Sequence, residues 1–211
     1  METDERIVRA MAESLRVRGY GATGVNHLVR AAGAPTGSIY HHFRGGKRAV
    51  AAAALRETGA AYGRLLPLLL DEHADLAEAI RAAFIAAGED MRGTGWATMC
   101  PVATVGGEIA DTEPELREVA AEVMASWVED GTAYLQRRGL SETGARTLTY
   151  ALISALEGAF LLARTLHSTE PFTAAGDALA TQAAALSGVT SSGGRAPSGS
   201  ASRTARRGST G

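Results

Sequence analysis

Side chains that can bond to nucleic acid gather close to the N-terminus of this 211-residue chain. They are Thr36, Ser38, Tyr40, His41 and His42, and Lys47 follows them. Hydroxyls, imidazoles and a phenol can reach phosphate oxygens or base edges. A lysine that opens a helix can hold a phosphate together with the free N–H groups there. Duplex DNA is the predicted ligand, and the alternative interpretation is a capped helical hairpin with a polar face.

The element in front of this cluster is predicted to be a short helix. Its apolar positions fall at i, i+3, i+4 and i+7, and they are Val25, Leu28, Val29 and Ala32. Thr23 is expected to cap the start of this helix, and Gly33 is expected to end it in a left-handed conformation. The exposed side of the helix carries Asn26.

A second helix is expected to begin around Pro35, because proline is tolerated in a first turn where its missing N–H would have no partner. Ile39 and Phe43, four residues apart, should face the core and leave the polar side chains outside. Gly37 removes a side chain where backbone can approach a phosphate. These two short helices together predict a helix-turn-helix, in which one helix supports another that enters a DNA groove.

This segment resembles the N-terminal domain of the TetR family of transcriptional regulators. The matching residues are Ala22-Thr23, Ala31-Ala32-Gly33, Gly37-Ser38-Ile39-Tyr40, His42-Phe43 and Lys47. Ala34-Pro35 replaces the usual Val-Ser, so the second helix lacks a hydroxyl cap, and Arg44-Gly45-Gly46 is one residue longer than the common spacing. Both departures, with Cys100-Pro101-Val102-Ala103, are similar to the LmrA/YxaF type. The resemblance spans roughly residues 4–187.

The resemblance implies an all-α protein with a three-helix DNA-binding domain over residues 1–46. A larger helical domain over 47–187 would bind a ligand and dimerise, and 188–211 would form a disordered basic tail. The implied function is a homodimeric repressor that binds a palindromic operator and is released by a small molecule. The DNA-binding residues would be Thr23, Asn26, Thr36, Gly37, Ser38, Tyr40, His41, His42 and Lys47.

The distribution of charge agrees with a DNA-binding N-terminus. Residues 1–56 hold nine Lys and Arg against four Asp and Glu, a net charge of +5. Residues 57–187 hold eight against nineteen, a net charge of −11. A basic end attracts a polyanion while an acidic body is repelled by it. Arg195, Arg203, Arg206 and Arg207 in the tail could add non-specific attraction to phosphate, although a solvated terminus without a role is the simpler interpretation.

The remaining chain reads as helices separated by one irregular stretch. A first helix over 4–17 carries Ile7, Met11 and Leu15 at fourfold spacing, and further helices are expected over about 47–70 and 75–91. Residues 92–103 look irregular because they are rich in Gly and Thr. A helix over about 112–138 is expected to start at a capping box, Thr112 to Glu115, with Pro114 in its first turn. The last helices are expected over 142–166, with Ser141 as the cap of its start, and over 172–186.

Two of these helices are expected to form a dimer interface. A seam at 4-3-4-3-4 spacing comprises Leu148, Leu152, Ala155, Ala159, Leu162 and Leu166. Another face of the same helix, with Ile153, Leu156, Phe160 and Ala163, is also apolar, so the helix must be covered on two sides. A second subunit packing on the helices around 142–166 and 172–186 would cover one of them. A fully intramolecular core is the alternative.

The effector is expected to be a small apolar or aromatic molecule held among the middle helices. Candidate ligand-binding residues are Trp96, Cys100, Phe84, Met99, Trp127, Tyr134 and Phe160, with Trp96 and Cys100 foremost because they lie in the irregular stretch. Ordinary core packing is the alternative for each of them. A TetR-like regulator without a small-molecule inducer is the alternative function.

Other classes of protein fit the sequence less well. Neither a catalytic constellation nor a metal motif is evident, since His41 and His42 diverge by about 100° on a helix and a single cysteine cannot form an internal disulfide. We therefore expect no enzyme activity, no metal and no cofactor, with a helical enzyme or an interaction module as the alternatives. The charged start and the absence of a run of 18 apolar residues predict a cytoplasmic protein without a membrane segment.

Overall fold

A computed structural model describes residues 1–109 and 111–192, with side chains up to Gly188. Nine α-helices follow one another in this part of the chain, and it contains no strand. They are α1 (Thr3–Arg18), α2 (Val25–Ala31), α3 (Ser38–His42), α4 (Gly46–Leu70), α5 (Leu76–Gly93), α6 (Pro101–Ile109), α7 (Pro114–Arg137), α8 (Glu142–Leu166) and α9 (Glu170–Ser192). The predicted all-α class is confirmed.

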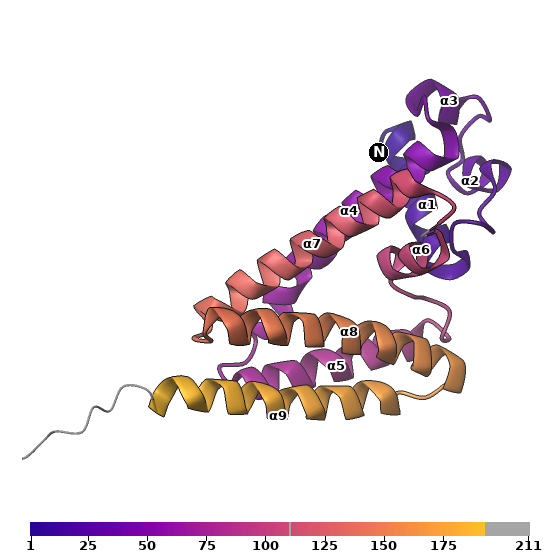
Figure 1. Ribbon diagram of the computed structural model, residues 1–211. Helices are drawn as coiled ribbons and strands as arrows, with labels where there is room; N and C mark the ends of the chain where they lie inside the picture. The colour runs from indigo at the N-terminus through magenta and orange to yellow at the C-terminus, as the bar shows by residue number, and fades with distance from the viewer. Residues whose placement is uncertain (110, 193–211) are drawn as a thin grey trace, which may run out of the picture.

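Helices α1 to α3 form a small N-terminal unit, here called the head, at one end of the molecule (Figure 1). Ile7, Met11 and Leu15 of α1 are completely buried in a core that the head shares with α4, as their spacing predicted. Arg6 of α1 donates from Nε to the carbonyl oxygen of Ala32, 3.0 Å away, at the end of α2. That bond satisfies a carbonyl that the end of a helix leaves free, so α1 fixes the position of α2.

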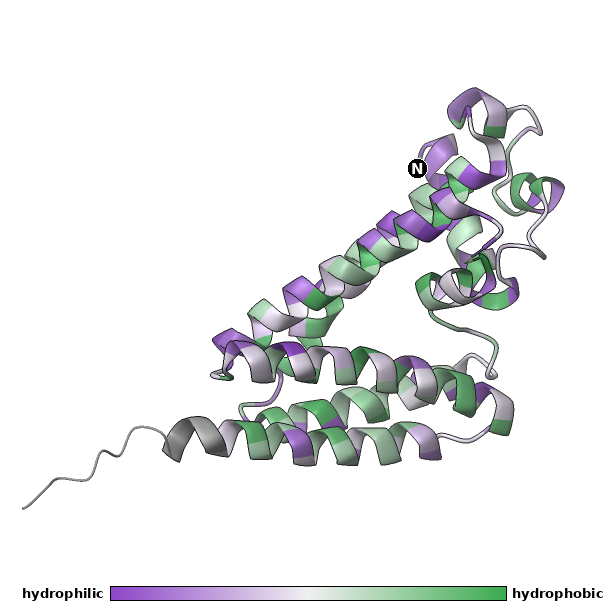
Figure 2. Cartoon of the chain, in the orientation of Figure 1, coloured by the Kyte–Doolittle hydropathy of each residue, from purple (hydrophilic) through white to green (hydrophobic). Residues whose placement is uncertain are grey.

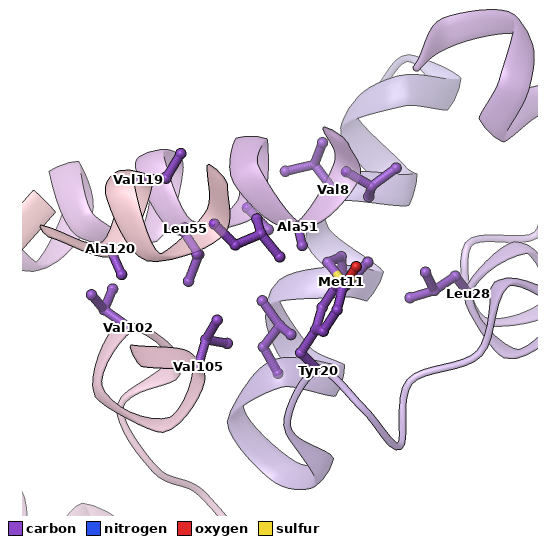
Figure 3. Close-up of a cluster of buried hydrophobic side chains, with 14 of the residues drawn as sticks. Val8, Met11, Tyr20, Leu28, Ala51, Leu55, Val102, Val105, Val119 and Ala120 are labelled. Carbon is purple, nitrogen blue, oxygen red and sulfur yellow. The ribbon is translucent and has the colours of Figure 1, made fainter. Parts of the chain in front are cut away.

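The long helices α4 and α7 lie side by side and connect the head to the rest of the molecule (Figure 1). Beside the head, α6 and the first half of α7 contribute to the same core as α1 and α4. Figure 3 shows Val102 beside Ala120 and Val105 near Leu55, in the same cluster as Met11. One continuous core therefore joins the head to α6 and α7. A displacement of either helix would change the packing around α1.

A second core lies at the opposite end, where α5, α8 and α9 pack as a layer against the ends of α4 and α7 (Figure 1). The hydropathy view shows apolar residues recurring along these helices (Figure 2). Phe172 of α9 is completely buried, and its ring meets Phe160 of α8 edge to face with 5.0 Å between ring centroids. The second core is thus built mainly by the helices that follow α4.

Helix α6 was missing from the sequence-based prediction. Its sequence, PVATVGGEI, contains two glycines and several β-branched residues, which have low helix propensity. Val102, Val105 and Ile109 are nevertheless buried on one face against the head core. Tertiary burial overrides the weak local preference, and the irregular stretch shrinks to Thr94–Cys100 between α5 and α6.

Three predicted helix starts differ from the structure. Thr23 does not cap α2, whose N-cap is Gly24, and Thr112 does not form a capping box, because Glu113 is the N-cap of α7 and makes no side-chain cap bond. Pro114 does occupy the first turn of α7. Helix α3 starts at Ser38, later than expected, because Ser38 N–H first closes a turn on the Pro35 carbonyl. As Ala34-Pro35 implied, α3 has no side-chain cap.

The C-terminal helices follow the prediction more closely. Ser141 caps α8, accepting a hydrogen bond from the N–H of Gly144. The last helix, expected to end at Leu186, continues to Ser192, so the first residues of the expected tail are helical. The tail arginines Arg195, Arg203, Arg206 and Arg207 lie outside the described residues.

Helix α8 presents large apolar side chains on the outside of the chain. Tyr150, Leu161, Leu162 and Leu166 are at least half exposed. Within the described residues α8 is long and apolar enough to cross a membrane by length and composition alone, and 28% of its apolar window is buried. One such helix is weak evidence for a membrane span, because the core helices of soluble proteins pass the same test.

Gly59 is expected to be indispensable where α4 and α7 meet. A Cβ at this position would overlap Cγ1 of Val123, and the Gly59 carbonyl accepts a hydrogen bond of 2.8 Å from Nε1 of Trp127. Gly59→Ala should lower the free energy of unfolding by about 1–3 kcal/mol through overpacking. Gly63→Ala is the matched control, since its Cβ would be 3.7 Å from the nearest atom and should instead stabilise the helix by about 0.5–1 kcal/mol. Urea unfolding of both variants tests this, and a stabilised Gly59→Ala variant would contradict it.

Candidate DNA-binding face and ligand cavity

The polar cluster predicted from the sequence lies on the outer face of the head. Asn26, Thr36, Gly37, His41 and His42 are exposed, and the Ser38 side chain is half-buried. Tyr40 is 62% exposed, while Ile39 on the opposite side of α3 is completely buried. Burial of Ile39 therefore anchors a short helix whose remaining side chains are free to contact a ligand.

Thr23 is placed differently from the other predicted DNA-binding residues. Its side chain is completely buried, and Oγ1 donates a hydrogen bond of 2.6 Å to the carbonyl oxygen of Gly19. The hydroxyl thus closes the turn after α1. The expectation that the Thr23 side chain contacts DNA is wrong for this conformation, because neither the side chain nor its hydroxyl is accessible.

Lys47 stands at the start of α4, as predicted, and lies over an aromatic ring. Its Nζ is 4.0 Å from the centroid of Tyr20. Burial lowers the pKa of Lys47 below its ordinary value, while Glu108 and Glu113 oppose that shift. A lysine ammonium favours the face of an aromatic ring, so Tyr20 holds this charge beside the first turn of α4.

The turn after α1 is bonded to α6 by one carboxylate. Glu108 accepts hydrogen bonds from the backbone N–H groups of Tyr20 and Gly21, at 2.7 and 2.6 Å. Just before this turn, Met99 N–H donates to the carbonyl of Arg16 at 3.0 Å, and Arg164 of α8 donates to the carbonyl of Val17 at 3.4 Å. The end of α1 is thus held by three separate parts of the larger domain.

Replacing Glu108 with glutamine is expected to loosen this junction. A glutamine offers one acceptor oxygen, and its NH2 group would face the second backbone donor. The loss should be about 1–2 kcal/mol of unfolding free energy, with about tenfold faster hydrogen exchange at the amides of Tyr20 and Gly21. Glu115→Gln is the control, because its ion pair with Arg48 is exposed and contributes little. Unchanged exchange at both amides would contradict this role of Glu108.

A large cavity opens between α4, α5, α7 and α8. Its volume is about 990 Å³. Tyr62, Phe84, Trp127 and Tyr134 contribute aromatic surface to its wall, and Arg16 is the one lining residue from the head. A mainly apolar cavity of this size with polar groups at several points of its wall is typical of a small-molecule site.

The polar atoms of this wall include two without hydrogen-bond partners. Nε of Arg16 and Oε2 of Glu157 are both buried and unpartnered. Glu157 lies next to Cys100, whose thiol pKa is raised, first by burial and then by the Glu157 charge. Burial likewise raises the pKa of Tyr62. The cavity therefore combines apolar surface with a few buried polar groups.

Two family models, both of transcriptional regulators, match the N-terminal and the C-terminal part of the chain. The family model of bacterial regulatory proteins of the tetR family matches residues 7–54. The model of the C-terminal domain of LmrA/YxaF-like transcriptional regulators matches residues 77–178. The HTH-type transcriptional regulator YxaF of Bacillus subtilis (strain 168) is 31% identical over 170 residues, covering 81% of this chain and 89% of that protein. The chain belongs to the TetR family.

Further similarities agree with this assignment. The HTH-type transcriptional regulator LmrA of Bacillus subtilis (strain 168) is 28% identical over 176 residues, covering 81% of this chain and 90% of that protein. The crystal structure of the regulatory protein TetR from Rhodobacter sphaeroides superposes with a TM-score of 0.73 at 26% identity, covering 84% of this chain and 97% of that one. The protein is a TetR-family transcriptional regulator of the DNA-binding repressor type.

The cavity of this TetR-family regulator contains most of the predicted ligand-binding residues. Six of them line it, namely Phe84, Met99, Cys100, Trp127, Tyr134 and Phe160. Trp96 does not line it, because Trp96 is half-buried against the second core and stacks on His167 with 5.8 Å between ring centroids. Both stacked residues have a positive φ, so local backbone geometry directs Trp96 away from the cavity.

Arg16 and Glu157 are not among the ligand-binding residues predicted from the sequence. Glu157 could have been found, because it is the one charged residue in the 17-residue stretch between Arg146 and Arg164. Arg16 could not, since nothing in the sequence of α1 indicates that its last turn borders a cavity in another domain.

The pKa of Glu157 predicts a pH-dependent stability difference. Burial raises it above its ordinary value of about 4.3, while the Cys100 thiol bond opposes the shift. An acid with a raised folded-state pKa destabilises the fold at neutral pH, and this penalty disappears as pH falls through the folded pKa toward the unfolded one. Glu157→Gln should therefore have a higher free energy of unfolding than wild type at pH 7. This difference between the two proteins should decrease as the pH is lowered toward 4.5. Urea unfolding across this range measures it, and a gap that does not change with pH would contradict it.

Proposed function

We propose that this TetR-family regulator is a homodimeric repressor that binds a pseudo-palindromic operator and is released by a small molecule in the cavity. The observation that carries the proposal is the position of Arg16, which lines the cavity while belonging to the last turn of α1 in the head. A ligand and the DNA-binding face are thus connected through one helix.

The DNA-binding face we propose comprises the exposed residues of α2 and α3 and the start of α4. Asn26, Thr36, Gly37, Ser38, Tyr40, His41, His42 and Lys47 would contact the duplex. The exposure of Tyr40 and the burial of Ile39 support this assignment, because they orient α3 with its polar side outward. Phosphate contacts would fix the head on the duplex, and base-edge contacts would supply the sequence preference.

Dimerisation is proposed through α8 and α9. Leu161, Leu162 and Leu166 are 58%, 52% and 63% exposed in the single chain. Exposed leucines grouped on one helix are unfavourable in water and are typical of a subunit interface. The amino-terminal part of the expected seam, with Leu148 and Leu152, is buried within the chain, so a partner would cover mainly its carboxyl-terminal part.

Release would follow when a ligand favours a conformation in which the two heads no longer match the half-sites. A ligand can shift the equilibrium between the two conformations only by the difference between its binding free energies for them. Contacts at Arg16, together with the Glu108 and Arg164 bonds to the end of α1, offer a physical route from cavity to head. In the same proposal residues 1–46 form the DNA-binding domain and residues 47–187 form the domain for ligand binding and dimerisation. The protein would be cytoplasmic and would have no catalytic activity.

Genome-wide binding of the purified protein, followed by footprinting of its strongest fragment, tests the DNA part. We expect one protected region with two half-sites related by a two-fold axis, and light scattering should give the mass of a dimer at micromolar concentration. Protection of a single half-site by a monomer would overturn the homodimer. A broad ligand screen against the same fragment tests release, and failure of every compound would favour a regulator without a small-molecule inducer.

A further inference from the structure

Glu157 lies on the stripe of α8 that forms one wall of the cavity. The lining residues of this helix recur at helical spacing, and they are Thr149, Leu152, Ile153, Leu156, Glu157 and Phe160. Five of these six lack a charge, so the carboxylate interrupts a wall that is otherwise suited to apolar contact. A carboxylate in such a place is costly unless something bonds to it.

The hydrogen bonds of this carboxylate are incomplete. The thiol of Cys100 bonds to it, but Oε2 is buried and has no partner. A buried acceptor left unpaired costs about 1–3 kcal/mol, and more when the group is charged. Oε2 itself is covered in this conformation, but Glu157 lines a cavity of about 990 Å³, and rotation of its carboxylate brings Oε2 to that cavity, where a bound molecule can supply the missing donor.

The charges of the lining do not favour an ionic ligand. Asp90, Asp130 and Glu157 are matched by three arginines, Arg16, Arg64 and Arg137. With the acidic and basic residues in equal number, specificity would come from a directed hydrogen bond and apolar contact.

We propose that the effector is an uncharged, mainly apolar molecule with an N–H or O–H group that donates to Oε2 of Glu157. This proposal rests on the ligand-responsive function given above and names its class of ligand. The bond would replace an unsatisfied acceptor with a satisfied one, while the aromatic and aliphatic lining covers the rest of the molecule. A ligand of the same shape without a donor leaves the acceptor unpaired, so it should bind more weakly.

Indole and benzofuran are suitable probes because they have nearly the same shape, and benzofuran has a ring oxygen where indole has an N–H. Calorimetry on the full chain should show indole binding in the millimolar range or tighter, with an affinity about tenfold above that of benzofuran. Equal affinity of the two probes, or no indole binding in that range, would overturn the proposal.

Two variants assign the preference to Glu157. Glu157→Leu removes the acceptor and a buried carboxylate, so it should fold and bind both probes with equal affinity. Glu157→Gln keeps a neutral acceptor oxygen and should retain a smaller preference, about threefold. A tenfold preference that persists in Glu157→Leu would show that another group accepts the bond and would overturn the proposal.

A gel shift with the footprinted operator separates failure of this proposal from failure of the proposed function. Operator binding of wild type and of Glu157→Leu is measured in the absence of probes. Loss of probe discrimination with intact operator binding supports the role of Glu157. Intact operator binding without any preference for indole rejects only the ligand class, and loss of DNA binding by wild type rejects the function.

Discussion

Tyr40→Ala is expected to weaken operator binding by about tenfold to a hundredfold while leaving the thermal stability of the protein unchanged. Tyr40 is 62% exposed and projects from α3, so its removal takes away a contact with the duplex. Loss of such a contact costs about 1–3 kcal/mol of binding free energy for the whole complex. Fluorescence anisotropy with the operator and a thermal melt measure the two quantities on the same sample.

Phe43→Ala is the matched comparison, three residues further along. Phe43 caps α3 at its C-terminus and is half-buried against the core of the head. Its truncation should lower the free energy of unfolding by about 2–3 kcal/mol and weaken DNA binding by loosening α3. An equal loss of thermal stability in both variants would contradict the assignment of Tyr40 to contact and of Phe43 to packing.

Arg138→Met is expected to lower the free energy of unfolding by about 3 kcal/mol, because Arg138 joins the ends of α4 and α7. Its guanidinium donates to the carbonyl oxygens of Leu70, His73 and Ala74, each at 3.0 Å. It also donates to the Tyr134 hydroxyl at 2.7 Å, and that hydroxyl donates to Asp71. Methionine keeps part of the aliphatic stem but supplies none of these donors, so three carbonyls lose their partner.

Arg137→Met is the control for this prediction. Arg137 is exposed, and its guanidinium carbon lies 5.7 Å from the ring centroid of Tyr134. Its replacement should change stability by no more than about 0.5 kcal/mol. Urea unfolding of the two variants at one pH gives the comparison, and similar losses for both would show that the carbonyl contacts of Arg138 contribute little.

Local sequence signals determined much of the helical framework. Ile7, Met11 and Leu15 repeat at fourfold spacing and are all buried, because one helix face must leave water. Ser141 caps α8 because a hydroxyl ahead of a helix can accept from its free N–H groups. Both signals act within a turn or two of the chain, so the sequence alone was enough to predict them.

The sequence predicted which side chains of the helix-turn-helix are exposed or buried, but not all details of its backbone. The exposure of Tyr40 and the burial of Ile39 follow from their places in a short apolar pattern. The start of α3 and the burial of Thr23 do not, because they depend on the Pro35 turn and on the Gly19 carbonyl. Helix propensities describe one residue in an average environment. The start of α3 and the burial of Thr23 depend instead on a hydrogen bond to one particular backbone carbonyl.

Only the tertiary structure decided which residues form the cavity and the junction. Arg16 and Glu157 are far apart in the sequence and meet one cavity because α1 and α8 both border it. Glu108 lies in a helix whose local propensity is weak, and its bonds to Tyr20 and Gly21 exist only once α6 packs on the head. The sequence by itself therefore determined the TetR family and most of the helices, including those that carry the proposed DNA-binding face. The buried polar groups that a ligand would meet were decided by packing between distant helices, which no local pattern encodes.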